Sequence, residues 1–162
     1  MSDVRVVRPA ELMLLPALEA AADTMYVPLG IGPLPGPGTV EEFGSALVVL
    51  VSGDPPVGLA RVDALAGGAH LEQLSVHPDH TRRGIGRALL QAACRWAATN
   101  GYDDITLATY RDIPWNGPFY ASEGFSEVGL ADDWYQDRGL PPEEPVMARF
   151  GTRVIMCRRL AT

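Results

Sequence analysis

Lysine is absent from this sequence of 162 residues, and cysteine is rare. Its two cysteines, Cys94 and Cys157, form no metal-ligand spacing and are too few for a disulfide framework, so both are expected to be ordinary packed thiols. Lysine is absent altogether, which excludes a Walker-type phosphate loop, because that loop needs a lysine after its last glycine.

Long apolar runs are also missing. No uninterrupted hydrophobic stretch approaches the roughly 18 residues of a membrane span, and the run from Ala46 to Val51 is only strand-sized. The first residues, Met1 to Arg5, do not combine a cationic start with an apolar stretch, so no signal peptide is expected. These features predict a soluble, cytoplasmic protein with no membrane partner.

An excess of positive charge is the third absence. The formal net charge is -7 and the pI is near 4.8. Domains that bind DNA or RNA through phosphates are basic, so this charge argues against a nucleic-acid partner. It suits a cationic acceptor such as an amine, although acidity also serves solubility.

The length and the hydrophobic content indicate a folded protein. A chain of 162 residues is the usual size of one domain, so 1–162 is predicted to be a single domain. Hydrophobic residues make up 47% and charged residues 20%, which supports a real core and excludes an intrinsically disordered chain.

Hydrophobic periodicity predicts an α/β fold with a mixed, mostly antiparallel central sheet flanked by helices. Turn residues separate three successive strand candidates, which should form an antiparallel meander. Strands are expected at 4–8, 46–52, 57–65, 70–76, 105–110 and 153–159. Helices are expected at 9–22, 39–43, 84–100 and 114–123, and loops at 27–38 and 131–145. The apolar face of the longest helix is expected to comprise Ile85, Leu89, Ala92 and Trp96.

The junction between the strand at 70–76 and the longest helix carries the clearest functional signal. Pro78 ends the strand, and two glycines, Gly84 and Gly86, open the helix. A helix start presents unpaired N–H groups and a positive dipole, and glycines let a phosphate approach them closely. Although the chain is acidic, three arginines gather at this point: Arg82, Arg83 and Arg87. An anion, specifically a phosphate, is therefore expected here; the alternative is a helix end with solvated arginines.

The glycine spacing separates two remaining kinds of phosphate loop. A dinucleotide-binding fingerprint needs a third glycine where Leu89 stands. The stretch from Thr81 to Arg87 instead resembles motif A of the GNAT acyltransferases, whose pattern is Gln or Arg, two residues, Gly, one residue, and Gly or Ala. Thr81 occupies the first position in place of Gln or Arg. Since that motif grips the pyrophosphate of acyl-CoA mainly through backbone amides, this departure should matter little.

A second stretch agrees with this resemblance. Phe119-Tyr120, three residues, and Gly124-Phe125 resemble the second signature of the GNAT family. The resemblance covers 4–125 in element order. It implies an N-acyltransferase that moves an acetyl or short acyl group from acetyl-CoA to a small-molecule or peptide amine by direct attack on the thioester, without a metal.

The resemblance also implies which residues contact the acyl donor. These are Leu74, Ser75, Val76, Thr81, Arg82, Arg83, Gly84, Ile85, Gly86, Arg87, Asn116 and Phe119. For Asn116, capping of the following helix is an equally simple explanation.

Direct attack requires a proton acceptor for the amine and a proton donor for the departing thiolate. The resemblance places Tyr120 beside the thioester sulfur as the donor; the alternative is a core aromatic residue. Glu72 is the expected base, because a carboxylate in a strand covered on both faces is costly unless it is paired or has a task. By alternation it should share a face with His70, Leu74 and Val76. An ion pair of Glu72 with Arg61 is the competing explanation, and His70, at an exposed strand end, or water is the alternative base.

The acceptor side has weaker signals. The loop at 27–38 and the acidic segment at 131–144 could wall the acceptor pocket. The second segment combines carboxylates with aromatic side chains: Asp132, Asp133, Trp134 and Tyr135. That combination suits a cationic amine, while a solvated loop or a homodimer surface is the alternative. A CoA-binding sensor without transferase activity and a non-catalytic interaction domain remain as competing functions.

Overall fold

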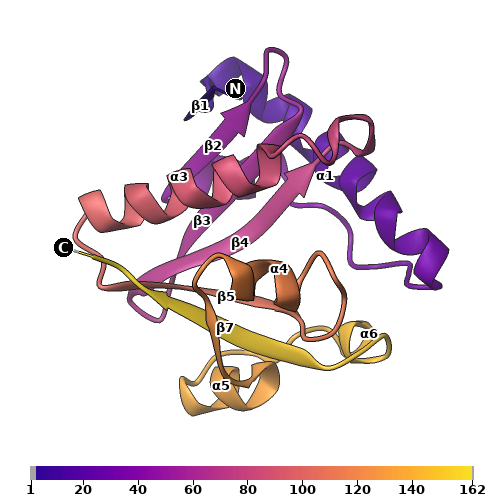
Figure 1. Cartoon of the computed structure of the whole chain (residues 1–162), viewed down its shortest axis with the longest axis vertical. Coiled ribbons are helices and arrows are strands. Elements are labelled where there is room, and N and C mark those ends of the chain that lie inside the picture. The colour runs from indigo at the N-terminus through magenta and orange to yellow at the C-terminus, as the bar shows by residue number, and fades with distance from the viewer. Residues whose placement is uncertain (1–2, 162) are drawn as a thin grey trace.

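The computed structural model describes residues 3–161 and contains one seven-stranded sheet with the order β1-β2-β3-β4-β5-β7-β6 (Figure 1). The parallel pair β4–β5 lies in the middle, and the other neighbouring pairs are antiparallel. The strands are β1 (Val4–Val6), β2 (Val48–Ser52), β3 (Gly58–Leu65), β4 (Gly68–Val76), β5 (Asp104–Tyr110), β6 (Ser126–Leu130) and β7 (Arg153–Arg159). The expected mixed, mostly antiparallel sheet and its central meander are confirmed.

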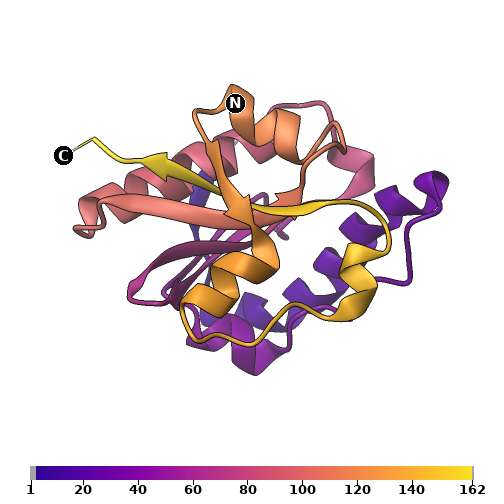
Figure 2. The ribbon, with the colours of Figure 1, turned by 90° about the horizontal axis from the view of Figure 1, so that it is seen from below.

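Helices cover both faces of this sheet (Figure 2). The long helix α3 (Ile85–Thr99) and the short α4 (Gly117–Ser122) lie on one face. The opposite face carries α1 (Leu15–Asp23), α2 (Val40–Ser45), α5 (Ala131–Asp137) and α6 (Pro145–Ala148). Three 3-10 helices join these elements: η1 (Pro9–Leu14), η2 (Thr24–Leu29) and η3 (Pro78–His80).

The main core forms between α3 and the sheet. The buried stripe of α3 comprises Ile85, Leu89, Leu90, Ala93, Cys94 and Ala97. The expected stripe was therefore slightly rotated: Ala92 and Trp96 lie at its margin and are half-buried. Residues 85, 89, 93 and 97 form the centre of the buried stripe. An α-helix has 3.6 residues per turn, so residues four apart lie one above the other on the same face.

On the other face, Leu15 and Leu18 of α1 pack with Phe43 of α2 against β2 and β3. Thr39 begins α2 with a capping box, in which its hydroxyl accepts the N–H of Glu42 and the Glu42 carboxylate accepts the N–H of Thr39. The short helix expected near Thr39 is thus present, with its cap.

The segment Pro9–Leu29 is long and apolar enough to cross a membrane by length and composition, although a core helix passes the same test. The segment is not an uninterrupted apolar run, because Glu11, Glu19 and Asp23 lie within it. In the structure this segment consists of η1, α1 and η2, and its buried leucines Leu15 and Leu18 belong to the core against β2 and β3.

The remaining differences lie where turns and loops were expected. The helix predicted from Pro114 begins only at Gly117, and Pro118 rather than Pro114 stands in its first turn. Part of the loop expected at 27–38 belongs to η2, and the segment after Phe125 contains β6, α5 and α6 in addition to the predicted last strand. Pairing of β6 with β7 and packing of α5 against β7, rather than their own periodicity, stabilise these two elements.

Candidate active site

The sheet opens between its two parallel strands. β3 pairs with β4 over the whole length of both strands, whereas β5 pairs with β4 only from Ala69 to Leu71. The opening begins at a β-bulge, because Arg61 and Val62 of β3 lie opposite Gln73 and Leu71, which leaves Glu72 as an extra residue. Beyond Leu71 one edge of β4 therefore has no neighbouring strand, and its backbone groups are free to bind a ligand.

The bulge also changes which side chains share a face of β4. Leu74 and Val76 pack with Ala69 and Leu71 in the core below α3. His70 lies on the opposite face, where its ring stacks on Trp134 with 6.3 Å between the ring centroids. Leu74 and Val76 therefore do not share the face of His70 as expected, because the extra residue shifts the alternation by one, whereas His70 and Glu72 do lie close together, with 3.8 Å between Nε2 and a carboxylate oxygen.

The glycine-containing loop after β4 has an unusual backbone. Arg82 and Gly84 both have left-handed conformations, with φ values of 62° and 76°. A Cβ atom at Gly84 would meet nothing within 4 Å, so its glycine is required by conformation and not by neighbouring atoms. The first N–H groups of α3 have no partner within the helix and lie at this loop. A positive φ at the non-glycine Arg82 is a strained feature of the kind found at binding sites.

The side chains of this loop differ in how free they are. Arg82 is exposed, and Arg83 lies with its Nη1 atom 3.2 Å from His80 Nδ1. Arg87 instead pairs with Glu123 at the end of α4, with its Nε atom 3.1 Å from Oε2. Ile85 is buried in the core, so only its amide is available to a phosphate.

The three residues of β4 expected to contact the acyl donor border the opening. Leu74 and Val76 are half-buried, and Ser75 is buried with its hydroxyl accepting a hydrogen bond from Gln73 Nε2 at 2.8 Å. Their contribution to a ligand would come from the backbone of the open strand edge.

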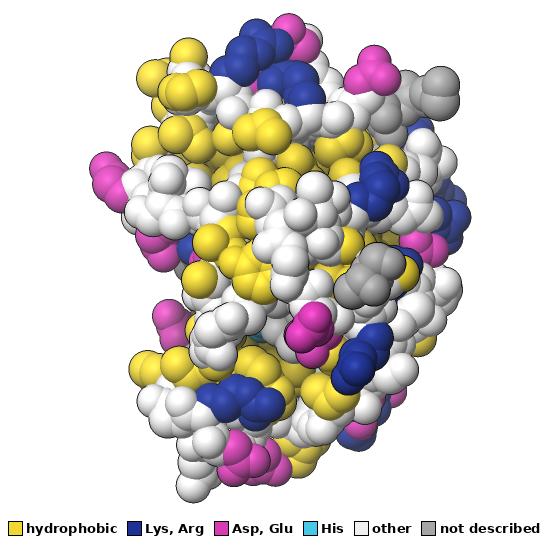
Figure 3. Space-filling model, turned by 90° about the vertical axis from the view of Figure 1, so that its left-hand side faces the viewer, with side chains coloured by type: hydrophobic (Ala, Val, Ile, Leu, Met, Phe, Trp, Pro, Cys, Tyr) yellow, Lys and Arg dark blue, Asp and Glu magenta, His cyan; other side chains and the backbone are white. Residues whose placement is uncertain are grey.

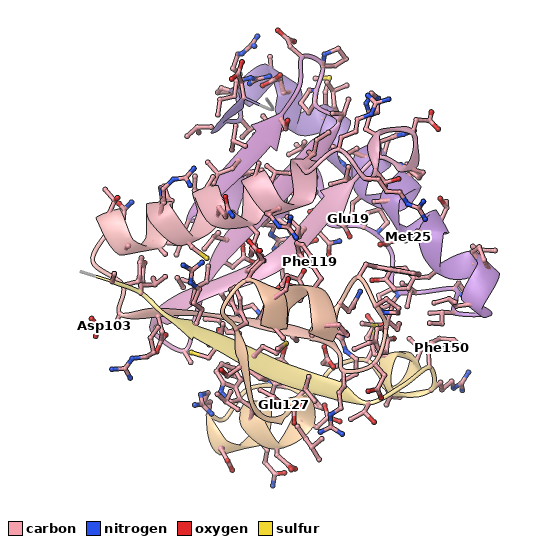
Figure 4. All side chains as sticks on the ribbon, in the orientation of Figure 1. Glu19, Met25, Asp103, Phe119, Glu127 and Phe150 are labelled. Atoms are coloured by element: carbon pink, nitrogen blue, oxygen red, sulfur yellow. The ribbon has the colours of Figure 1, made fainter. Side chains whose placement is uncertain are left out.

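Tyr120 lies on α4 and packs its ring against Phe119 and Phe125, at centroid distances of 5.2 and 5.9 Å. Figure 4 shows Phe119 between α4 and β4. Burial raises the pKa of Tyr120 well above its usual value, and negative charge on Tyr26 would raise it further. The phenol is therefore protonated at neutral pH and able to donate.

Asn116 precedes α4 but its side chain makes no capping hydrogen bond, so the capping explanation is wrong. Its Oδ1 atom accepts a hydrogen bond from Thr109 Oγ1 at 2.8 Å, and its Nδ2 atom donates to the Tyr26 hydroxyl at 3.0 Å. These contacts join the end of β5 to η2.

Glu72 is less buried than expected, because the bulge places it at the surface with a side-chain exposure of 48%. Partial burial raises its pKa, as does the nearby Asp63, and exposure to solvent weakens both effects. The competing explanation, an ion pair with Arg61, is not observed: Arg61 binds Asp63 through two hydrogen bonds of 3.0 and 2.7 Å.

His70 is 2% exposed, so the expected position at an exposed strand end is also wrong. Its Nδ1 atom lies 2.8 Å from Thr106 Oγ1 and its Nε2 atom 3.8 Å from a Glu72 carboxylate oxygen. Burial lowers its pKa to about 4, so the imidazole is neutral at pH 7.

Two carboxylates of α1 were not anticipated. Glu19 is 7% exposed, and its Oε1 atom accepts one long hydrogen bond, 3.3 Å, from the Gly38 N–H. Burial raises the pKa of Glu19 to about 7 and that of Asp23 to about 6. A sequence signal was present: Glu19 follows Leu15 by four residues and precedes Ala22 by three, so it shares the buried face of α1.

The acidic segment after β6 lies against the same face of the sheet as α1. It contributes Trp134, which stacks on His70, and Glu143, whose carboxylate binds Arg153 through hydrogen bonds of 3.0 and 2.7 Å. Burial raises the pKa of Tyr135. A hollow of about 620 Å³ lies beside the turn between β3 and β4, on the side of the molecule that faces the viewer in Figure 3. It is lined by Asp133, Trp134, Asp137 and the start of β4. Among residues 3–161, no three histidine, cysteine or acidic side chains are placed to hold a metal ion.

A family model described as an acetyltransferase (GNAT) domain matches residues 44–127, slightly more than half of the chain. The match includes β2 to β5, the glycine-containing loop, α3 and α4, which together form the opening.

Solved structures share the whole architecture. A PaiA N-acetyltransferase from Thermoplasma acidophilum, in complex with coenzyme A, superposes with a TM-score of 0.71 at 17% identity, covering 98% of this chain and 99% of that one. The ribosomal-protein-S18-alanine N-acetyltransferase from Escherichia coli gives 0.69 at 19%, covering 100% and 96%. An acetyltransferase from Thermus thermophilus gives 0.64 at 20%, covering 99% and 97%. At these identities the likeness shows the fold.

Proposed function

The chain belongs to the GNAT family of acetyltransferases, and on this premise we propose that it transfers the acetyl group of acetyl-CoA to an amine by direct attack on the thioester. The observation that supports this most is the opening beyond Leu71, which has a helix N-terminus with free amides at one end and the protonated phenol of Tyr120 beside it.

The acyl donor is proposed to lie along this opening. Its pyrophosphate would bind the amides from Thr81 to Arg87, where the open space around Gly84 accepts a phosphate and Arg82 and Arg83 add positive charge. Its pantetheine arm would lie along the free edge of β4 at Leu74 to Val76, extending the sheet as an added strand does. Phe119 would contact the arm from α4, and the buried Asn116 would act through Thr109 and Tyr26.

Two proton transfers accompany the reaction. Tyr120 donates a proton to the sulfur as the C–S bond breaks, and a carboxylate at the opening takes a proton from the acceptor ammonium. Glu72, at the bulge where the opening begins, is the candidate from sequence for the second role.

The acceptor is proposed to be a primary amine of a small molecule or peptide, which approaches from the face that carries α1 and α5. Carboxylates of Glu19, Asp23 and Glu72 and the aromatic rings of Trp134 and Tyr135 lie on that side and suit a cation. Dependence on acetyl-CoA is consistent with a cytoplasmic location.

The proposal is tested by release of the CoA thiol from acetyl-CoA with benzylamine, putrescine or a peptide with a free α-amino group, and by mass analysis of the product. Acetylated amine is the expected result. Binding of acetyl-CoA without thiol release for any amine would contradict transfer and indicate a CoA-binding sensor.

A further inference from the structure

Glu19 and Glu11 are two buried carboxylates with opposite surroundings. Each is 7% exposed. Glu11 is fully satisfied: both oxygens bind Arg5, at 2.7 Å each, and one also accepts the Arg8 N–H at 2.9 Å. Its pKa is lowered to about 2. Glu19 has one weak hydrogen bond, from the Gly38 N–H, and no ion pair with any of residues 3–161.

An unpaired carboxylate buried in this way costs folding free energy, so its presence calls for a reason. The charged side chains near Glu19 do not neutralise its carboxylate. Burial raises its pKa most, and Asp23 on the same helix and Glu72 on β4 raise it further; the Gly38 N–H lowers it, and Arg61 of β3 is the one positively charged group that does so. Arg61 is already engaged with Asp63. A cation at Glu19 must therefore come from outside the chain.

The position of Glu19 relates it to the opening of the sheet. Figure 4 shows Glu19 where α1 passes the C-terminal half of β4. A Cβ atom at Gly38, whose amide binds Glu19, would lie 2.8 Å from Arg61 Nη1, and Arg61 pairs with Gln73 directly after the bulge. Glu19 thus lies beside the point where β4 and β5 separate, on the face from which the acceptor approaches.

We propose that Glu19, rather than Glu72, binds the ammonium group of the acceptor and takes its proton. This inference rests on the proposed transferase function. One N–H bond of the ammonium breaks and an O–H bond forms on the Glu19 carboxylate, which frees the nitrogen lone pair. The nitrogen attacks the thioester carbonyl carbon, the C–S bond breaks, and the sulfur takes the proton of Tyr120. The second proton lost by nitrogen returns to Tyr120 through water, and Glu19 releases its proton to solvent.

The raised pKa of Glu19 suits a residue that accepts a proton from the acceptor ammonium. A carboxylate must be deprotonated to accept the proton, and it is a better acceptor the closer its pKa lies to that of the amine. The raised pKa of Glu19, about 7, meets both needs slightly above neutral pH. Glu72 is half exposed and therefore closer to an ordinary surface carboxylate.

The test compares Glu19→Gln with Glu72→Gln and with Glu11→Gln, a control of equal burial outside the site. For wild type, kcat/KM with the most reactive amine of the panel should rise with pH along a limb near pH 7. Glu19→Gln should lower kcat/KM by about 10²–10⁴-fold and remove that limb, with acetyl-CoA binding unchanged. Glu11→Gln should keep the limb. A limb that persists in Glu19→Gln, or that disappears only in Glu72→Gln, would overturn the assignment.

A second readout does not require turnover. With CoA in place of acetyl-CoA, putrescine should raise the melting temperature of wild type and Glu11→Gln but not of Glu19→Gln. Absence of thiol release from wild type would defeat the transferase function, and the melting shift then decides on Glu19 as an ammonium site: an equal shift in wild type and Glu19→Gln, or none in either, contradicts it.

Discussion

Gly84 and Gly101 flank α3 and provide a matched pair of perturbations. Both have left-handed backbones, with φ of 76° and 86°, and a Cβ atom at either position would meet nothing within 4 Å. Gly84 lies at the N-terminus of the helix, beside the proposed pyrophosphate site, and Gly101 just beyond its C-terminus. Glutamate at each position introduces the same strain and the same charge, so the two variants differ only in their place along the helix.

The effect on stability follows from two terms. A non-glycine residue in the left-handed region costs about 1–2 kcal/mol. The helix dipole favours a carboxylate at the N-terminus and disfavours it at the C-terminus, by about 0.3–1 kcal/mol. Gly84→Glu should therefore lower the free energy of unfolding by about 1 kcal/mol and Gly101→Glu by about 2 kcal/mol. At about 2–4 °C per kcal/mol for a domain of this size, Gly84→Glu is the more stable variant.

The effect on acetyl-CoA binding should run the other way. Ligand at a hundredfold its dissociation constant should stabilise wild type by about 2.7 kcal/mol, or roughly 5–11 °C. Gly101→Glu should keep this shift in thermal melting, whereas Gly84→Glu, which places an anion where the phosphates bind, should lose it. An acetyl-CoA shift of equal size in both variants would refute the assignment of the pyrophosphate to this loop.

Three further predictions concern single side chains. Tyr120→Phe should lower kcat by about 10²–10⁴-fold, because the variant has no hydroxyl to donate a proton. The melting temperature and acetyl-CoA binding should be nearly unchanged, because the ring contacts with Phe119 and Phe125 persist. A variant that turns over as fast as wild type would show that Tyr120 is not the proton donor. Glu19→Gln should be as stable as wild type below pH 4.5 and more stable above pH 7, because a carboxyl whose pKa is raised by folding stabilises the fold only while it is protonated, and this contribution is lost as pH rises from 4.5 through about 7. The difference between a pKa of 4.5 and one of about 7, at about 1.36 kcal/mol per pH unit, corresponds to about 3 kcal/mol in the free energy of unfolding. Equal stability of the two proteins in denaturation experiments at both pH values would contradict the burial argument. Leu89→Ala, at a fully buried position of α3, should cost about 2–5 kcal/mol in urea denaturation, and a loss below about 1 kcal/mol would show that this core is loosely packed.

Local chemistry explains why much of the fold was predictable from sequence. The turns at Gly53 and Gly67 have left-handed backbones that glycine adopts readily, so the meander of β2 to β4 follows from residues close together in the chain. The same holds for the cap of α2 at Thr39 and for the first residue before α3, Gly84, where short-range conformation decides the structure. The family resemblance of the glycine-containing loop and of the stretch ending at Phe125 likewise rests on contiguous residues.

Only the tertiary structure decided which groups meet at the opening. The bulge at Glu72 depends on the register between β3 and β4, and a shift of one residue moves His70 to the face opposite Leu74 and exposes half of Glu72. Arg61 could pair with either of two carboxylates, and the observed geometry selects Asp63. The pKa of Glu19 is raised because α1 packs over β4 and withholds both water and a cation from it, and such burial arises from contacts between segments far apart in the sequence. The sequence by itself therefore determined most of the elements up to Phe125, their order and the glycine-containing loop, whereas long-range packing decided the short elements after Phe125 and the surroundings of each acid and base.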